Sequence, residues 1–196
     1  MTLDDLLRIA SDRYKQSPED ILQLMDIIAY HETGHDQRMQ PTARQILNDG
    51  SYGKGAGLYQ FEKGPKQGGA TAMQRLRNIM LEGRFGPKLT EEELPEFMNY
   101  DRSIGVDASL LDKEEQDMMF LANILEDPRS NATFLGVTPD NLVNYYRDIH
   151  NAGTVDRSAS FLESLKDFKK QQADKKIEEI IDGTISSPAD EAFITN

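Results

Sequence analysis

Residues 17–34, SPEDILQLMDIIAYHETG, contain a complete helix signal. The opening Ser-Pro-Glu-Asp is typical of an N-cap, a proline at the first helical position and an acidic first turn. Ile21, Met25, Ile28 and Glu32 then follow at intervals of three or four residues, which places them on one face of a helix. Gly34 is expected to end it. The sequence therefore predicts a helix whose apolar face ends in a carboxyl group.

Helical signals dominate the rest of the chain as well. Capping patterns predict helices that begin near Thr90, Asp112 and Thr138, and a further helix is expected over about 160–181. Alternating strand patterns are nearly absent. Half of the 14 glycines lie within residues 50–69, where we expect a loop or small β segment with positive φ angles or close backbone contacts. The expected fold class is therefore mainly α, with one glycine-rich segment.

The composition restricts the classes of function. Lys and Arg number 22 against 34 Asp and Glu, which gives 196 residues a net charge of −12. This excess of acid argues against nucleic acid as a partner, because phosphates must be neutralised by basic side chains. No apolar run approaches the ~20 residues that span a bilayer, and the acidic N-terminus shows no signal peptide. The absence of cysteine excludes disulfide and thiolate chemistry.

Glu32 is the first candidate for chemistry. A carboxyl group on a buried helix face is partly desolvated, which raises its pKa and lets it serve as a general acid near neutral pH. The alternative, for a single glutamate, is that the helix turns slightly and Glu32 meets solvent or a buried arginine. Glu32 alone therefore does not decide between a catalytic and a structural role.

Two downstream segments add to Glu32. They are GAGLYQ at residues 55–60 and HNAG at residues 150–153. With Glu32-Thr33 they resemble the soluble lytic transglycosylase family, which has a helix-terminal Glu-Ser, then Gly-x-x-Gly-Leu-Met-Gln, then Tyr-Asn-Ala-Gly. The resemblance covers about residues 20–165, and residues 37–76 are most similar to virion-associated members from tailed phages.

The resemblance implies a lysozyme-like fold, shared with goose-type lysozyme, and cleavage of peptidoglycan glycan strands. Glu32 would be the catalytic acid/base. It would protonate the oxygen between N-acetylmuramic acid and N-acetylglucosamine, and then accept the proton of the muramoyl C6 hydroxyl, which attacks C1 to give a 1,6-anhydro product. The residues implied to bind the substrate along the cleft are Gly57, Leu58, Tyr59, Gln60, His150 and Asn151.

Two positions depart from the family pattern. Tyr59 stands where a methionine is usual, and His150 stands where a tyrosine usually hydrogen-bonds the catalytic glutamate. An imidazole could make the same hydrogen bond, but its protonated form would lower the pKa of Glu32. The pH dependence is therefore expected to differ from the family's.

The resemblance also suggests an organisation and a location. Residues 1–17 would be an N-terminal helical extension, residues 18–165 the lysozyme-like domain, and residues 166–196 a charged C-terminal helix with a polar tail. The protein would be carried in a phage particle and act in the host cell wall, although the same features suit an endolysin that a holin releases for lysis. Its partners would be glycan strands and other virion or tail proteins, and no cofactor or metal is implied.

Three alternatives stay open. His31-Glu32-Thr33-Gly34-His35 is a literal His-Glu-x-x-His, so a zinc peptidase with Glu32 as general base is conceivable, completed by His150. No substrate-binding sheet precedes it, and it leaves residues 55–60 unexplained. Hydrolysis rather than transglycosylation would need a second acid, for which Glu62 and Asp36 are candidates. A virion component could also keep the fold without catalysis.

Overall fold

The computed structural model describes residues 1–34, 37–127, 129, 134, 136–150 and 156–181. Helix accounts for 59% and strand for 6%, which confirms the mainly α class. Among the described residues, no helix combines the length and apolar character needed to cross a membrane. The elements are α1 (Leu3–Tyr14), α2 (Pro18–Glu32), β1 (Arg44–Ile46), β2 (Tyr52–Ala56), β3 (Phe61–Glu62), α3 (Gly68–Glu82), η1 (Glu91–Glu93), η2 (Glu96–Met98), η3 (Ala108–Leu110), α4 (Lys113–Glu126), α6 (Leu142–Tyr145), η4 (Tyr146–His150) and α7 (Ser158–Ile181).

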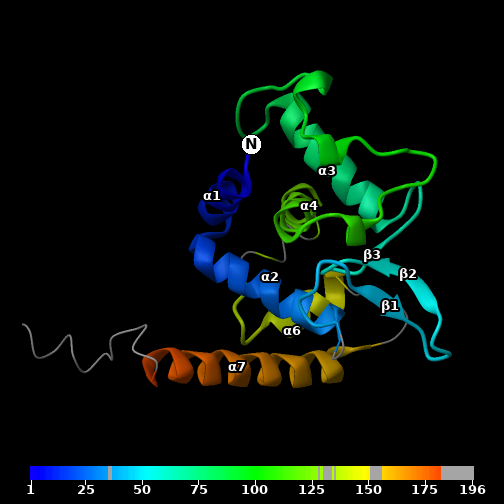
Figure 1. Ribbon diagram of the computed structural model, residues 1–196. Helices are drawn as coiled ribbons and strands as arrows, with labels where there is room; N and C mark the ends of the chain where they lie inside the picture. The colour runs from blue at the N-terminus through cyan, green and yellow to red at the C-terminus, as the bar shows by residue number, and fades with distance from the viewer. Residues whose placement is uncertain (35–36, 128, 130–133, 135, 151–155, 182–196) are drawn as a thin grey trace, which may run out of the picture.

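Helix α4 lies at the centre of the molecule, with α1 and α3 packed against it and the small sheet to one side (Figure 1). Asp112 caps α4 through the backbone N–H of Glu115, as the sequence predicts. The helix then buries an almost uninterrupted set of residues, including Phe120 and Leu121. Such all-round burial is expected of a helix surrounded by others.

The hydrophobic core crosses both expected domain boundaries. Leu6 and Tyr14 of α1 belong to the same buried cluster as Phe161 and Phe168 of α7. Helix α1 therefore contributes to the core, because it supplies an apolar face that α2 and α4 cover. The charged helix likewise begins inside the core. The polar tail expected over 182–196 lies outside the described residues.

Helix α2 confirms the signals at both of its ends. The Ser17 side chain accepts a hydrogen bond from Asp20 N–H, Pro18 occupies the first turn, and Gly34 follows the helix with φ of +62°. Its inner face is fully buried at Ile21 and Ile28. Helix α7 runs along its other side in Figure 1, so α2 is enclosed from two directions.

The helix expected from Thr138 begins later than predicted. Residues 138–141 form a turn in which Asn141 N–H donates to the Thr138 carbonyl and Asn141 Oδ1 accepts from Thr138 N–H. The α-helical part is limited to α6, and the chain then widens into the π-helical turn η4. The expected boundary was wrong because the Asn141 side chain stabilises a turn in place of a first helical turn.

The glycine-rich segment forms the small antiparallel sheet, in the order β1-β2-β3. Ala56 pairs with Arg44 on one side and with Phe61 on the other. The chain then turns at Gly57, whose φ is +77° and where a Cβ would lie 2.2 Å from Gln116 Oε1. Glycine is therefore required at this position for both its conformation and its space.

The segment between α3 and α4 is anchored to α3 by a buried arginine. Arg77 donates to the Met98 carbonyl at 3.0 Å and pairs with Glu91. The Thr90–Glu93 capping box forms as expected, although the turn that it opens is the short 3₁₀ helix η1. Met98 is completely buried, so this segment covers one end of the core.

Gln116 of α4 connects the helical core to the sheet. Its Oε1 accepts from Leu58 N–H at 2.6 Å, and its Nε2 donates to the carbonyls of Pro41 and Leu111 at 3.0 and 2.8 Å. The side chain is completely buried. One amide thus satisfies three buried backbone groups from three separate loops.

We expect Gln116→Met to lower the free energy of unfolding by about 3 kcal/mol, because it leaves these three backbone groups without partners. The change keeps the volume nearly constant, so cavity formation does not confuse the result. Urea unfolding followed by circular dichroism measures the difference.

Gln74→Met in α3 is the matched control, because the Gln74 amide donates to Asn78 one turn away in the same helix. It should cost less than 1 kcal/mol. Equal effects of the two substitutions would show that Gln116 does not connect the loops energetically.

Candidate active site

Glu32 is the last residue of α2, and its side chain is 10% exposed. The chain leaves the helix at Thr33, whose hydroxyl donates to the Ala29 carbonyl at 2.7 Å and accepts from Met39 N–H at 2.9 Å. These bonds fix the helix end and the loop after it. The carboxyl group is therefore held at a defined point, as the apolar stripe of the sequence predicts.

Two side chains of η4 meet this carboxyl group. The Tyr146 hydroxyl donates to Glu32 Oε1 at 2.7 Å, and His150 Nε2 lies 3.5 Å from the same oxygen. Tyr146 is completely buried, stacked on Phe161, and His150 lies edge-on to Phe120. Both partners are thus positioned by aromatic packing on α7 and α4.

The pKa of Glu32 is lowered, in contrast to the expected rise. Burial raises the pKa, but the hydrogen bond and positive charge of His150, together with the hydrogen bond of Tyr146, lower it more. Burial alone predicts a rise, whereas the sequence also indicated that a protonated imidazole at position 150 would lower the pKa of Glu32, and the second direction is the one found.

Tyr146 stays a neutral donor in this arrangement. Burial and the charge of Glu32 raise its pKa well above the usual value, and the nearby guanidinium of Arg157 offsets only a part of this rise. The hydroxyl therefore keeps its proton across the range in which Glu32 titrates.

A groove passes the carboxyl group. Two adjoining hollows, of about 460 and 380 Å³, share Glu32, Gln45, Gln60 and Arg157. A third hollow continues along the tip of the β1–β2 hairpin and again includes Gln45 and Arg157. We call this continuous depression the groove. Its lining is mostly polar, and Glu32 lies where the first two hollows join.

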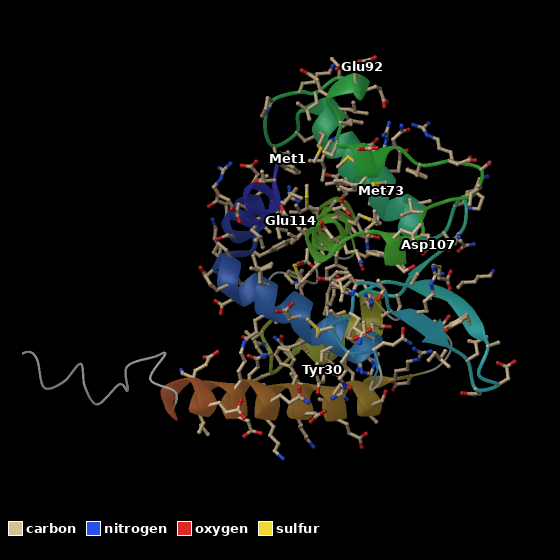
Figure 2. The ribbon with its side chains drawn as sticks, in the orientation of Figure 1. Met1, Tyr30, Met73, Glu92, Asp107 and Glu114 are labelled. Carbon is tan, nitrogen blue, oxygen red and sulfur yellow. The ribbon has the colours of Figure 1, made fainter. Side chains whose placement is uncertain are left out.

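The sheet wall of the groove is fixed by two ion pairs to Asp107. Asp107 accepts from Arg44 at 3.0 Å and from Lys63 at 3.2 Å, so one carboxylate joins β1 and the residue after β3. Asp107 is labelled beside the sheet in Figure 2. Its pKa is lowered, because hydrogen bonds from Ser109, Lys63 and Arg44 outweigh the effect of burial.

The segment GAGLYQ contributes to the groove mainly through its last residue. Gln60 lines both hollows at Glu32, with φ of +47° and its amide donating to the Gly57 carbonyl at 2.9 Å. Gly57 forms the buried turn beneath. The side chains of Leu58 and Tyr59 are turned into the core, a difference from their expected place along the cleft.

Tyr59 is buried because it has partners there. Its ring stacks on Phe120 at 4.1 Å, and its hydroxyl donates to Asp117 Oδ1 at 2.5 Å. Asp117 also accepts from Lys113 at 2.7 Å. Tyr59 therefore supports the wall of the groove from behind, together with the buried polar cluster on α4.

The structure brings Glu32, Gln60 and His150 together, as the three motifs imply. Asn151 of the third motif lies outside the described residues. Tyr146 and Arg157 were not predicted. Tyr146 lies four residues before His150, a spacing that places both on one face of a helix and could have revealed it.

His31 points away from the groove. Its Nδ1 lies 2.9 Å from Ser164 Oγ, and its ring is edge-on to Tyr146 and Phe161. Burial lowers its pKa. The neighbouring Tyr30 also meets α7, donating to Asp167 at 2.7 Å, as its label between the two helices in Figure 2 indicates. His31 is thus part of the α2–α7 contact.

His35 and Asp36 lie outside the described residues. Among the residues that the structure does describe, no three His, Asp or Glu side chains are placed together to hold a metal ion.

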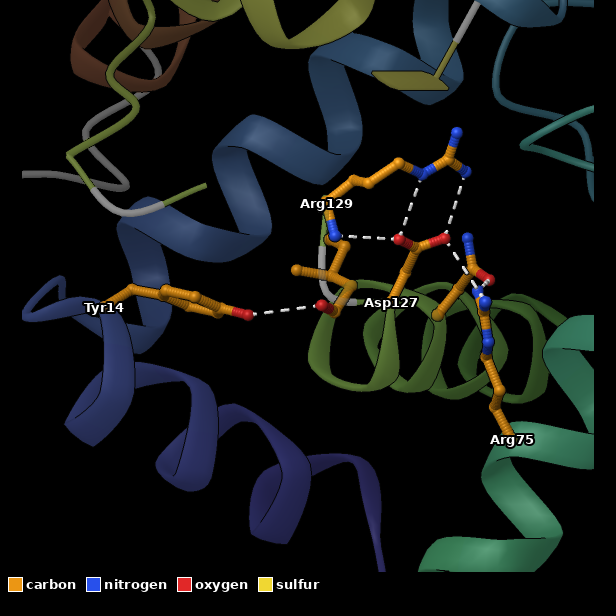
Figure 3. Close-up of polar contacts among 6 residues, drawn as sticks. Tyr14, Arg75, Asp127 and Arg129 are labelled. Atoms are coloured by element: carbon orange, nitrogen blue, oxygen red, sulfur yellow. Dashed lines mark hydrogen bonds and ion pairs between the residues drawn. The ribbon is translucent and has the colours of Figure 1, made fainter. Parts of the chain in front are cut away.

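A second charged cluster lines the groove beyond Glu32. Figure 3 shows Arg75 and Arg129 on the same carboxylate of Asp127, each with a contact of 3.2 Å to Oδ2. Arg75 also donates to Asn123. Burial raises the pKa of Asp127, but the hydrogen bonds and charges of the two arginines outweigh burial and lower the pKa to about 2. The cluster therefore keeps its ion pairs at all ordinary pH values.

Comparisons with protein families, with curated proteins and with solved structures found no match to this chain. The case for a function is therefore carried by the residues and their geometry.

We expect His150→Ala to raise the pKa of Glu32, because the burial remains while the largest opposing contribution is removed. Tyr146→Phe should raise it by a smaller amount. Carbon-detected NMR titration of the Glu32 carboxyl group measures both changes against the wild-type protein, with Glu19, exposed in the first turn of α2, as the internal control. An unchanged Glu32 titration in His150→Ala would contradict the pairing.

Proposed function

We propose that this protein has a lysozyme-like fold and is a peptidoglycan lytic transglycosylase with Glu32 as its single acid/base. One observation supports the proposal most: a mostly buried carboxyl group at a helix end opens into a polar groove and is held there by a tyrosine and a histidine. A glutamate with a purely structural role would not need a groove beside its carboxyl group.

The proposed reaction uses Glu32 twice: it donates its proton to the leaving sugar, and it then regains a proton from the C6 hydroxyl. Glu32 protonates the glycosidic oxygen, and the bond from muramoyl C1 to that oxygen breaks to release N-acetylglucosamine with a free 4-hydroxyl. The carboxylate then accepts the C6 hydroxyl proton as O6 attacks C1, closing the 1,6-anhydro ring. No water is consumed, and Glu32 ends in its starting state.

The surroundings of Glu32 act in two directions on the proton that it must carry. The hydrogen bond and positive charge of His150, with the hydrogen bond of Tyr146, lower the pKa of Glu32, whereas its burial raises the pKa and so favours the protonated carboxyl group. A sugar that displaces water from the groove acts in the same direction, because a neutral pair is easier to desolvate than an ion pair.

The groove suits a polysaccharide. Gln45 and Gln60 line the same hollows as Glu32, and carboxamides can donate to and accept from sugar hydroxyl and acetamido groups. Three hollows in succession would accommodate several sugar rings along one strand. The proposed partner is therefore a peptidoglycan glycan strand, met by a virion-associated enzyme in the host cell wall beside other virion or tail proteins.

A muramidase is the second candidate, because the exposed Glu62 also lines the groove. A second carboxylate in the same groove could activate a water molecule in place of the C6 hydroxyl. The products of the two reactions differ, so the reaction itself can decide.

We expect Glu32→Gln to reduce release of soluble muropeptides from purified sacculi by about 10²–10⁴-fold, the usual contribution of a general acid/base. Mass spectrometry of the wild-type products should find 1,6-anhydro ends. Glu19→Gln at the other end of α2 is the control and should keep full activity, with both variants folded by circular dichroism.

Wild-type turnover in Glu32→Gln would remove the proposal altogether. Products with ordinary reducing ends, which no longer form in Glu62→Gln, would show that the protein is a muramidase and not a transglycosylase.

We expect activity to be independent of metal ions. Treatment with EDTA followed by gel filtration should leave muropeptide release within about twofold of the untreated rate, and elemental analysis should find no stoichiometric zinc. A zinc peptidase would instead lose its activity with EDTA and regain it with zinc, and His35→Ala would abolish metal binding.

A further inference from the structure

Arg157 contributes to the lining of all three hollows of the groove. It lines both hollows at Glu32 and also the hollow at the tip of the β1–β2 hairpin. The residue is exposed and immediately precedes α7. Its guanidinium is close enough to Tyr146 and His31 to lower the pKa of each. Arg157 therefore lines the groove both at Glu32 and at the tip of the β1–β2 hairpin.

The other arginines of the groove already have anionic partners. Arg44 pairs with Asp107, while Arg75 and Arg129 share Asp127. No ion pair among the described residues includes Arg157. An exposed guanidinium without a carboxylate is notable in a chain whose net charge is −12, because acidic side chains are plentiful around it.

The chemistry of a guanidinium indicates what it would bind. Its planar fork of N–H donors matches a carboxylate with two parallel hydrogen bonds, and such charge-assisted pairs are among the stronger polar contacts. The sugar rings of a glycan strand carry no charge themselves. In peptidoglycan, carboxylates occur on the branch at muramoyl C3, either as a free lactyl group or on the peptide stem.

We propose that Arg157 is a binding residue for a carboxylate on the muramoyl branch, so that the groove recognises acidic branched strands rather than sugar rings alone. This inference rests on the proposed peptidoglycan substrate. It assigns Arg157 a contact with a part of the ligand that does not react, which would fix the register of the strand relative to Glu32.

Binding can be tested apart from cleavage in the Glu32→Gln background. The protein is sedimented with intact sacculi, and with sacculi whose carboxylates have been converted to amides by carbodiimide and ammonia. We expect amidation of the sacculi, or Arg157→Gln in the protein, to weaken binding about tenfold, and the two together to add little more. Arg8→Gln on α1 makes the same change in net charge away from the groove and should bind as the parent does.

The source of the carboxylate is identified by a competition experiment. Soluble glycan strands, from which an amidase has removed the peptides, are added to compete with sacculi for the protein. Weaker competition after these strands are amidated assigns the contact to the lactyl group, and equal competition assigns it to the peptide stem. Both results support a carboxylate site. If Arg157→Gln binds intact sacculi as the parent does, or if amidation weakens binding equally with and without Arg157, the inference is wrong.

Muropeptide release by the protein with Glu32 intact, measured in parallel, separates the two proposals. Binding that depends on Arg157 without any cleavage would overturn the proposed enzyme and keep the carboxylate site. Cleavage without such dependence would overturn the site and keep the enzyme. Neither binding nor cleavage would overturn both.

Discussion

The side chain of Gln116 is the interaction on which the two walls of the groove depend. It extends from the central helix α4 and hydrogen-bonds to Pro41, Leu58 and Leu111, so one amide ties the loops beside the sheet to the helical core. The sheet has three short strands and little apolar surface of its own. Its position relative to Glu32 is therefore set by α4, from which Phe120 also orients Tyr59 and His150.

The charge on Glu32 follows from this arrangement. Burial raises its pKa, and the hydrogen bonds of His150 and Tyr146, together with the charge of His150, lower it more. Tyr146 stays a hydrogen-bond donor because its own pKa is raised. The site thus separates two tasks: Tyr146 orients the carboxyl group, and His150 adjusts its charge. In the family that the sequence resembles, one tyrosine is expected at the position of His150.

The sequence predicted those parts of the structure whose signals are local. Ser17, Gly34 and the stripe ending in Glu32 defined α2 and the burial of the carboxyl group, and Asp112 defined the start of α4. The sheet was expected only as a glycine-rich loop or β segment, because its strands are stabilised by pairing and by Gln116 rather than by β-forming residues.

Two features required contacts between distant residues and could not be predicted in this way. The hydrogen bond from Tyr146 to Glu32 depends on the widening of the chain at η4, which no local signal shows. Tyr59 was placed in the cleft, whereas its buried position depends on Asp117 and Phe120. The lowering of the Glu32 pKa by a protonated His150 was expected from the motif, and the structure adds the distance between the two groups.

The hydrogen bond between Tyr146 and Glu32 joins residues 114 positions apart in the chain. These residues meet only where η4 packs against the end of α2. The signals that form α2 are local, but its terminal carboxyl group has neither Tyr146 nor His150 as a partner until η4 docks. A chain in which η4 is displaced would therefore hold Glu32 without the groups that orient it.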